Sequence, residues 1–325
     1  MIVVYVETSA EGVREVSLEA ITFARSLAAE GGGVPVDAVV VGPLGDGVAA
    51  ELAAYGVRTV HHVDGEDFER YSGAATARAV VAARQAGGSV VVTAGGTNRG
   101  NEVLARVATH LGVAMAANAV AFSGLSPFVV TRQVGGGAAL EEVRLGQRPA
   151  VFTVAGHAVE PAAAETPGAA TVAPLAVELT AADLAVRVVS VDHDARGGTD
   201  SLKSARVVVG AGRGAGGPEG FGEVLELAEL LGGSLGVSRV VTSLGWRPHH
   251  EQVGQTGSRI SPEIYIPCGI SGAIQHWAGC ASSKVILAIN TDPEAPMMTK
   301  ATYAVVGDMH EVVPAVVEEI RSRRS

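Results

Sequence analysis

The stretch "EIYIPCGISGAIQHWAG", Glu263 to Gly279, decides the fold of the second half of the chain. "EIYIP" is a short run rich in β-branched and aromatic residues, which predicts a strand. The glycines of "CGISG" predict a turn, and "GAIQHWAG" predicts a short helix. A strand that passes through a glycine turn into a helix is typical of an α/β sheet.

The same alternation continues on both sides of this stretch. The sequence predicts strands over 206–210, 284–290 and 303–307, and helices over 221–233 and 309–324. The second half of the chain is therefore expected to form a parallel-sheet domain.

The first half also alternates between apolar strands and amphipathic helices. Strands are predicted over 1–7, 36–42, 59–63 and 89–96, and helices over 15–30, 47–56, 74–88 and 101–112. A hairpin around Gly135 to Gly137 and a further strand over 149–156 follow. This pattern indicates a doubly wound, Rossmann-like sheet of the kind found in nucleotide hydrolases, with antiparallel strands added.

A polar, glycine-containing segment at 192–205 separates the two patterns. We expect two α/β domains, residues 1–195 and residues 196–325, with unusual polar and glycine residues denser in the second.

Composition limits the class of protein. The 325 residues carry a net charge of −10 without a block of Lys or Arg, which argues against a nucleic-acid partner. No apolar run is long enough to cross a membrane, and the first residues do not resemble a signal peptide. The two cysteines form neither a disulfide framework nor a metal-ligand pattern. We expect a cytoplasmic protein without membrane insertion.

The turn Gly269–Gly272 has three possible roles. It matches the start of a nucleophile elbow, but Ala273 stands where that motif needs glycine. Ser271, Asp308 and His310 have the chain order of a hydrolase triad, although the last two lie only two residues apart. The turn could also be a plain tight turn, or an anion cradle in which Gly269, Ser271 and Gly272 free backbone N–H groups before a helix.

Two further loops offer polar groups. Gly212, Gly214 and Gly217 have dinucleotide-binding spacing, and Arg213 lies among them, so an NAD-dependent enzyme stays an alternative. The loop Gln252–Gly257 could present several donors, or could be a connection only. Adjacent histidines at 61–62 and 249–250 lack the companions of a metal site, and we predict no metal.

Single polar residues at other points also suggest a binding site. Arg239 follows Ser238 among apolar residues, where a buried charge would need a partner. Asn290, Thr291 and Asp292 follow one predicted strand and Asp308 follows the next, where parallel sheets bind ligands. Asn290 and Asp308 could each instead only cap a helix.

Taken together, these segments resemble the alpha subunit of the electron transfer flavoproteins. The likeness is carried by "QVGQTG", by "IYIPCGISGAIQHWAGCASSKVILAIN" and by "DPEAP", and it covers residues 205 to 325 closely and the first half more loosely. It implies that the second domain binds FAD and that a beta subunit completes a heterodimer.

The resemblance also implies a role for single residues. Arg239 would lie over the isoalloxazine ring, Gln255 and Thr256 near its N5 edge, and His276 beside its C2 carbonyl. Gln252, Ser271, Gln275 and Asn290 would contact the ribityl and pyrophosphate, and Asp308 the adenosine. The remaining predicted contacts are Arg213, Ser238, Val253, Gly254, Gly257, Gly269, Ile270, Gly272, Ala273, Thr291 and Asp292.

The implied function is electron transfer from flavoprotein dehydrogenases, such as acyl-CoA dehydrogenases of fatty acid β-oxidation, to a membrane quinone oxidoreductase. A carrier needs no nucleophile or general base of its own, and we predict no catalytic residue. Within the family, an electron-bifurcating form that oxidises NADH is the alternative. Arg239 and His276 together could raise the potential for the first electron by on the order of 100 mV.

Overall fold

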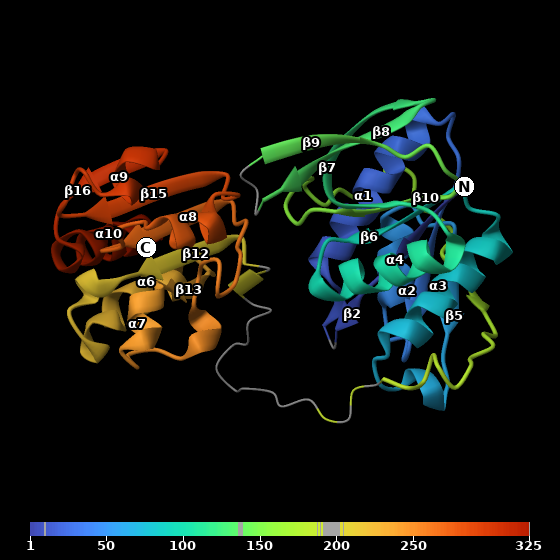
Figure 1. Cartoon of the computed structure of the whole chain (residues 1–325), viewed down its shortest axis with the longest axis horizontal. Helices are drawn as coiled ribbons and strands as arrows, with labels where there is room; N and C mark the ends of the chain where they lie inside the picture. Colours follow the sequence, from blue (N-terminus) through green and yellow to red (C-terminus); the bar gives the residue numbers. More distant parts are fainter. Residues whose placement is uncertain are drawn as a thin grey trace. The chain divides into compact units, whose positions relative to one another are not determined.

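The computed structural model of the chain describes residues 1–9, 11–135, 139–186, 188, 190, 202–203 and 205–324. These residues form two compact units, the first mainly within Met1–Val134 and Leu140–Val191 and the second mainly within Asp192–Ser325 (Figure 1). The predicted boundary after residue 195 and the predicted turn at 136–137 lie outside the described residues. Each unit is an α/β sheet, as the sequence predicts.

The first unit contains all the helices and strands predicted for it, together with four strands that were not predicted, Thr8–Ser9, Gly12–Val13, Met115–Leu125 and Thr171–Pro174. Together they are β1 (Ile2–Tyr5), β2 (Thr8–Ser9), β3 (Gly12–Val13), α1 (Glu15–Glu30), β4 (Val36–Val41), α2 (Val48–Ala54), β5 (Thr59–Val63), α3 (Gly73–Gly87), β6 (Val91–Gly95), α4 (Asn98–Leu111), β7 (Met115–Leu125), β8 (Phe128–Val134), β9 (Ala139–Arg144), β10 (Ala150–Val154) and β11 (Thr171–Pro174), with a 3₁₀ turn at Glu66–Phe68.

The large sheet of this unit has the strand order β11-β5-β4-β1-β6-β10-β7-β8-β9. The pairs from β11 to β7 are parallel, and β8 runs antiparallel to β7. Helices α1 and α2 pack on one face and α3 and α4 on the other (Figure 1). The sheet is therefore doubly wound, with an antiparallel extension at one edge.

The second unit contains β12 (Val207–Ala211), α6 (Gly222–Leu230), β13 (Ser234–Val237), α7 (Arg239–Ser243), β14 (Ile264–Cys268), α8 (Ile274–Cys280), β15 (Val285–Asn290), α9 (Pro296–Lys300), β16 (Tyr303–Val306) and α10 (Met309–Arg324). Three 3₁₀ turns, Arg213–Ala215, Pro218–Phe221 and His249–Glu251, lie between them.

The five strands of this unit are all parallel, in the order β13-β12-β14-β15-β16. The chain moves from β12 to β13 on one side and then to β14 on the other side of β12. This reversal is the topological switch point at which open α/β sheets bind ligands, beyond the carboxyl ends of the strands.

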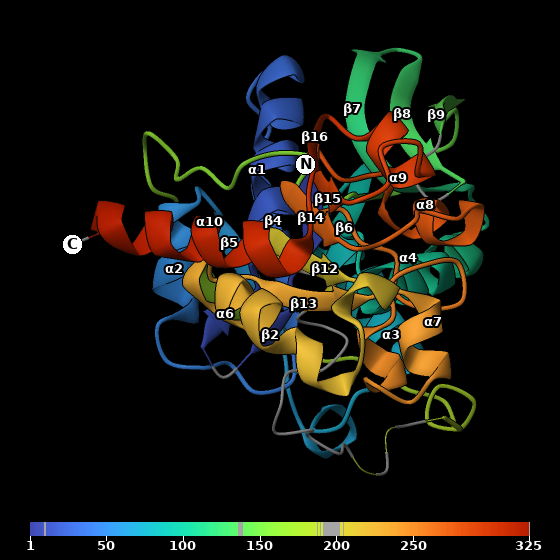
Figure 2. The same cartoon turned by 90° about the vertical axis from the view of Figure 1, so that its left-hand side faces the viewer.

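Helices cover both faces of this second sheet. Figure 2 shows α6 and α10 side by side on one face and α8 and α9 on the other. The cores are aliphatic, with Val209, Val224 and Val313 in one layer and Val208, Ile286 and Met297 in the other. These layers fix the strand ends that carry the site.

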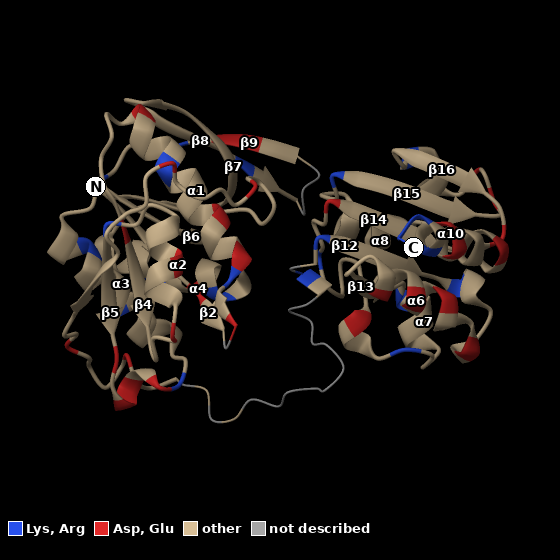
Figure 3. Ribbon diagram, turned by 180° about the vertical axis from the view of Figure 1, so that it is seen from behind, with Lys and Arg blue, Asp and Glu red and all other residues tan. Residues whose placement is uncertain are grey.

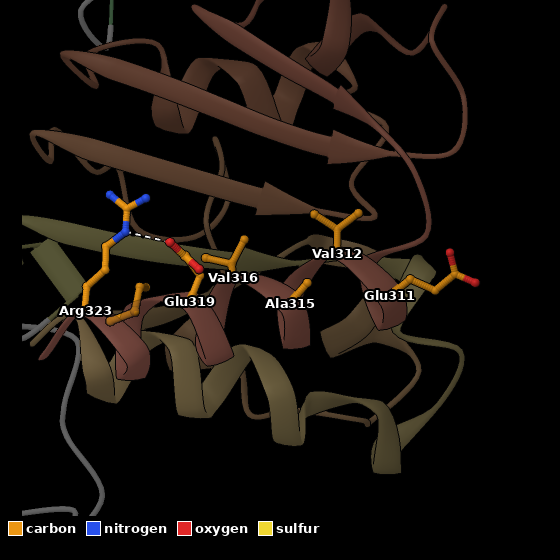
Figure 4. A pocket seen from close by; sticks show the side chains of 7 residues that line it. Glu311, Val312, Ala315, Val316, Glu319 and Arg323 are labelled. Atoms are coloured by element: carbon orange, nitrogen blue, oxygen red, sulfur yellow. Dashed lines mark hydrogen bonds and ion pairs between the residues drawn. The ribbon is translucent and has the colours of Figure 1, made fainter. Parts of the chain in front are cut away.

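An apolar groove runs along α10, away from the strand ends. Figure 4 shows Val312 and Val316 projecting from α10 toward the strands, and the Arg323 guanidinium pairs with the Glu319 carboxylate at 2.7 Å. Its charged residues are at the rim, so this groove offers little for binding a polar ligand.

Charged residues of both signs are interspersed over both units (Figure 3). Several arginines pair with acids in the same unit, such as Arg58 with Asp37 and Arg247 with Glu251. Among the described residues, no helix has the length and apolar character needed to cross a membrane.

Candidate functional site

A cleft of about 500 Å³ lies at the carboxyl ends of the five parallel strands of the second unit. Each strand contributes residues at or just beyond its carboxyl end: Arg213 after β12, Ser238 after β13, Gly269 after β14, Asn290 as the last residue of β15 and Asp308 after β16. The cleft thus occupies the ligand-binding edge of this class of sheet.

Glycines bring two of these strand ends together. A Cβ on Gly212 would lie 2.3 Å from the Gly269 carbonyl oxygen, and a Cβ on Gly214 would lie 2.6 Å from the Gly269 Cα. Gly269 itself has a φ of +62°, which favours glycine. The glycines after β12 therefore allow close packing of two loops.

The dinucleotide interpretation of Gly212, Gly214 and Gly217 finds no support in this geometry. Two 3₁₀ turns follow Gly212, and α6 begins only at Gly222. A dinucleotide fingerprint instead opens directly into a helix whose N-terminus faces the pyrophosphate.

The loop Gln252–Gly257 packs against α8. A Cβ on Gly279 would lie 2.4 Å from Gly254 Cα, and the Gln255 N–H donates to the Gln275 carbonyl at 2.7 Å. Gly254, with a φ of +142°, permits this approach. The loop and the helix therefore form one wall of the cleft together.

Gln252 connects that wall to α7. Its side-chain oxygen accepts from the Thr242 hydroxyl at 2.6 Å, and its side-chain nitrogen donates to the Thr256 hydroxyl at 2.9 Å. Gln252 is only 2 % exposed. It therefore orients Thr256, and its amide is largely used within the protein.

Two buried polar atoms of residues in the cleft make no hydrogen bond of normal geometry with the described residues, although the Val253 backbone lies close to one of them. They are the Ser238 hydroxyl oxygen and the His276 Nδ1. Buried polar groups are nearly always paired in folded proteins, and an unpaired one needs an explanation. Two such atoms in one cleft point to a polar ligand.

His276 is neutral at pH 7 in this environment. Burial lowers the pKa of its imidazole to about 4, and the Val253 backbone offsets part of that shift. Its Nε2 lies 2.8 Å from the Tyr265 hydroxyl oxygen. His276 can therefore act beside Arg239 as a neutral hydrogen-bonding group and not as a second positive charge.

The cationic residues of the cleft are Arg213 and Arg239. Both side chains are exposed, and neither forms an ion pair with another described residue. Arg239 is the first residue of α7, at the rim of the cleft. Arg239 and Val240 are both exposed there, whereas Val237 and Val241 are buried, so the charge of Arg239 needs no buried partner.

The polar residues after β15 and β16 also serve the fold. Asn290 donates to the Ile270 carbonyl at 3.1 Å, and the Asp308 carboxylate accepts from the His310 N–H at 2.9 Å at the start of α10. Asp292 accepts from the Glu294 N–H at 3.0 Å. Asp308 thus caps a helix and lines the cleft at once.

The anion-cradle prediction needs one correction. The Gly269 N–H is not free, because it donates to the Ile289 carbonyl at 2.8 Å. In the described part of the chain, the Ser271 and Gly272 N–H groups make no hydrogen bond, so only these two match the prediction.

All predicted site residues except Gly257 line this one cleft. Gly257 lies beneath the loop, where a Cβ would approach the Gln252 carbonyl oxygen to 2.2 Å. The cleft also includes Gly214, Val240, Ala295, Gly307 and Met309, which the sequence analysis did not select as contacts. Gly214 belongs to the glycine motif after β12 and Ala295 to the "DPEAP" segment, whereas Val240, Gly307 and Met309 belong to no motif identified in the sequence.

The hydrolase interpretation finds no matching contact. The His310 Nδ1 lies 3.0 Å from the Glu223 carboxylate, and the Asp308 carboxylate accepts from the backbone. Burial raises the pKa values of both Cys268 and Cys280 to about 12, so neither thiol is activated. In the described residues, no group of three or more His, Cys, Asp or Glu residues could hold a metal.

The family models cover both units. The electron transfer flavoprotein domain matches residues 2–183, and the electron transfer flavoprotein FAD-binding domain matches residues 201–281. The second match includes the strand ends of β12, β13 and β14, which form much of the cleft.

Curated relatives match along nearly their whole length. The chain is 36% identical to the electron transfer flavoprotein subunit alpha of Syntrophomonas wolfei, over 98% of each chain. It is 33% identical to that of Thermoanaerobacterium thermosaccharolyticum, over 94% of this chain and 93% of the relative. Protein FixB of Clostridium saccharobutylicum is 32% identical, over 98% of this chain and 95% of the relative. The chain therefore belongs to the alpha-subunit family of the electron transfer flavoproteins, which are flavin-binding electron carriers.

Proposed function

We propose that the cleft of the second unit holds FAD and that the chain is the FAD-carrying subunit of a heterodimeric electron carrier. The observation that carries this proposal is that two residues lining the cleft, Ser238 and His276, each have a buried polar atom, Oγ and Nδ1, without a hydrogen bond of normal geometry to the described residues. A flavin has carbonyl oxygens, ring nitrogens and hydroxyl groups that can pair with both.

The shape of the cleft fits an elongated cofactor. Neighbouring strands lie about 4.8 Å apart, so the five strand ends extend over roughly 19 Å. The glycines at positions 214, 254, 269 and 272 keep the floor free of side chains. FAD combines a flat ring, a polyol, a pyrophosphate and an adenosine, and such a ligand can follow a row of strand ends.

The chain's residues would bind and orient the cofactor, which itself supplies the redox chemistry when bound. Arg239 would place a positive charge beside the ring, and His276 a neutral hydrogen-bonding group. Arg213 and the Ser271 and Gly272 N–H groups suit the pyrophosphate, because all three favour negative charge. Asp308 suits a ribose hydroxyl or an adenine edge.

The proposed partners and pathway are suggested by membership of the family. We propose that residues 1–195 contact a beta subunit and that residues 196–325 form the FAD domain. The carrier would take electrons from flavoprotein dehydrogenases, including those of fatty acid β-oxidation, and deliver them to a membrane quinone oxidoreductase from the cytoplasm.

The test is co-expression of the chain with its beta subunit, followed by purification and flavin analysis. The proposal predicts FAD at one equivalent per heterodimer, with a flavin absorbance spectrum. Two flavins together with oxidation of NADH would instead identify the bifurcating form. A heterodimer without flavin, and unable to bind added FAD, would refute the proposal.

A further inference from the structure

Tyr265 and His276 form a buried pair directly beneath the cleft. Tyr265 lies on β14 and is fully buried, and His276 lies on α8 and is 7 % exposed. The Tyr265 hydroxyl oxygen and the His276 Nε2 are 2.8 Å apart, and the two rings are stacked with their centroids 6.1 Å apart. The family assignment gives no role to Tyr265, which does not line the cleft.

The direction of this hydrogen bond can be assigned from the surroundings. Burial raises the pKa of the Tyr265 phenol well above its usual value, so the hydroxyl keeps its proton. In the described part of the chain, His276 Nε2 is the partner that the structure gives to this hydroxyl. A buried O–H group requires an acceptor, so Tyr265 donates and Nε2 accepts.

The acceptor role of Nε2 fixes the other nitrogen of the ring. A neutral imidazole carries one proton, and when Nε2 accepts, that proton is on Nδ1. His276 lines the cleft, and its Nδ1 makes no hydrogen bond of normal geometry with a described residue, although the Val253 backbone lies close to the ring. The histidine can therefore bind a ligand in the cleft through one atom only, as an N–H donor.

Two glycine contacts hold the pair in place. A Cβ on Gly210, on the neighbouring strand β12, would lie 2.5 Å from the Tyr265 hydroxyl oxygen and 2.8 Å from a ring carbon. On the other side, a Cβ on Gly254 would lie 3.6 Å from the His276 Cα. The missing side chain at 210 provides the space for the tyrosine ring, and the Gly254 loop supports the histidine backbone.

We propose that Tyr265 is a positioning residue: its hydroxyl donates to Nε2 and thereby fixes His276 as the Nδ1–H tautomer, which offers a donor to an acceptor atom of the flavin. This inference rests on the proposed FAD site. Without Tyr265, Nε2 has lost its donor, so the ring can carry its proton on either nitrogen and can rotate. A donor near the ring stabilises the electron-richer reduced flavin, so its loss lowers the potential for the first electron.

The experiment uses the purified heterodimer labelled with ¹⁵N-histidine. The ring-nitrogen NMR signals of His276 are assigned with His276→Gln, and the tautomer is read in the native protein, in Tyr265→Phe and in the control Tyr303→Phe. Tyr303 is 63% exposed, so the control makes the same chemical change away from the cleft. FAD affinity and the one-electron potential are measured on the same samples.

The expected result is a single Nδ1–H tautomer in the native protein and in Tyr303→Phe. Tyr265→Phe should show a mixture of tautomers or the Nε2–H form, a lower potential for the first electron, and FAD affinity weakened by about fivefold. A native protein with the Nε2–H tautomer would overturn the proposal. So would a Tyr265→Phe protein that keeps both the Nδ1–H tautomer and the native potential.

The tautomer of the native protein needs no substitution, so the test stays decisive even if Tyr265→Phe does not fold. Incorporation of 3-fluorotyrosine gives a second, milder change. It makes the phenol a stronger donor, so the Nε2 signal should move further away from its position in Tyr265→Phe. Failure of the FAD proposal is distinguishable, since it appears as a native heterodimer without flavin whatever its histidine tautomer.

Discussion

At the scale of single residues, positive charge and hydrogen bonding in the cleft come from different side chains. Arg239 is exposed at the rim and carries a full charge, while His276 is buried and neutral. A positive charge near a reduced flavin acts over several ångströms, whereas a hydrogen bond acts only at contact. The two residues therefore have different effects on the cofactor and can be tested separately.

Arg239→Gln is predicted to lower the potential for the first electron while FAD still binds. Because the side chain is exposed, solvent screens the charge, and we expect a shift of roughly 40–80 mV. Redox titration measures it. Arg323→Gln, at the far end of α10, removes the same charge and is the matched control. If the Arg239 variant and the native protein had equal potentials, Arg239 would not lie near the flavin.

Ser238→Ala is predicted to weaken FAD binding by about tenfold without loss of stability. The hydroxyl oxygen has no partner among the described residues and does not cap α7, so its removal costs the fold nothing. Titration of the flavin-free heterodimer with FAD gives the affinity, and urea unfolding gives the stability. Ser243→Ala, exposed on the same helix, is the control. A stability loss at unchanged affinity would assign Ser238 a structural role.

His276 is predicted to make the second unit less stable in acid. Its pKa in the folded chain is about 4, below the value of about 6.5 for an exposed imidazole, so protonation favours the unfolded chain. The penalty is absent above about pH 6.5 and grows to about 3 kcal/mol as the pH falls to about 4. Both tryptophans, Trp246 and Trp277, lie in the second unit and report its unfolding by fluorescence. If His276→Gln lost stability in parallel with the native protein over this range, another group would be responsible.

At the scale of elements, glycine contacts hold the walls of the cleft together. The substitution Gly279→Ala would place a methyl group 2.4 Å from Gly254 Cα and push α8 away from its loop. We expect a loss of about 1–3 kcal/mol in the free energy of unfolding and weaker FAD binding. Gly222→Ala, at the start of α6 with nothing within 4 Å of its Cβ, should be neutral or stabilising by up to about 1 kcal/mol. Urea unfolding measures the stability of both variants. If Gly279→Ala were as stable as the native protein, the Gly254–Gly279 contact would be unimportant.

The elements with a clear period were predictable from the sequence. The apolar runs that became β1, β4, β12 and β15, and the long helices α1 and α10, agree with the predicted ranges within a few residues. The sequence analysis did not predict β7, which is rich in alanine, or β13, which has four residues and a glycine. Such segments have neither strong strand propensity nor alternation, and only neighbouring strands stabilise them.

The site was predictable where topology alone defines it. Parallel strands place their carboxyl ends at one edge, so polar residues after separate strands could be expected to meet. Contacts that depend on packing could not be expected. Tyr265 and His276 are eleven positions apart on a strand and a helix, and their hydrogen bond depends on the space above Gly210. The exposure of Arg239 also depends on how α7 is placed, which its apolar neighbours do not reveal.

At the scale of the whole molecule, the two units have different roles in this account. The first is a doubly wound sheet whose switch point carries close-packed glycines: a Cβ on Gly96 would lie 2.6 Å from the Asn118 side-chain oxygen, and one on Gly95 would lie 2.7 Å from Val16. The second carries the open cleft with its unpaired polar atoms. For this reason our proposal places FAD in the second unit.

The most direct measurement is an experimental structure of the FAD-containing heterodimer. The account predicts flavin density along the carboxyl ends of β12 to β16, with Ser238 Oγ and His276 Nδ1 each within hydrogen-bond distance of the cofactor. Flavin bound elsewhere, with that cleft empty and both atoms still unpaired, would contradict it.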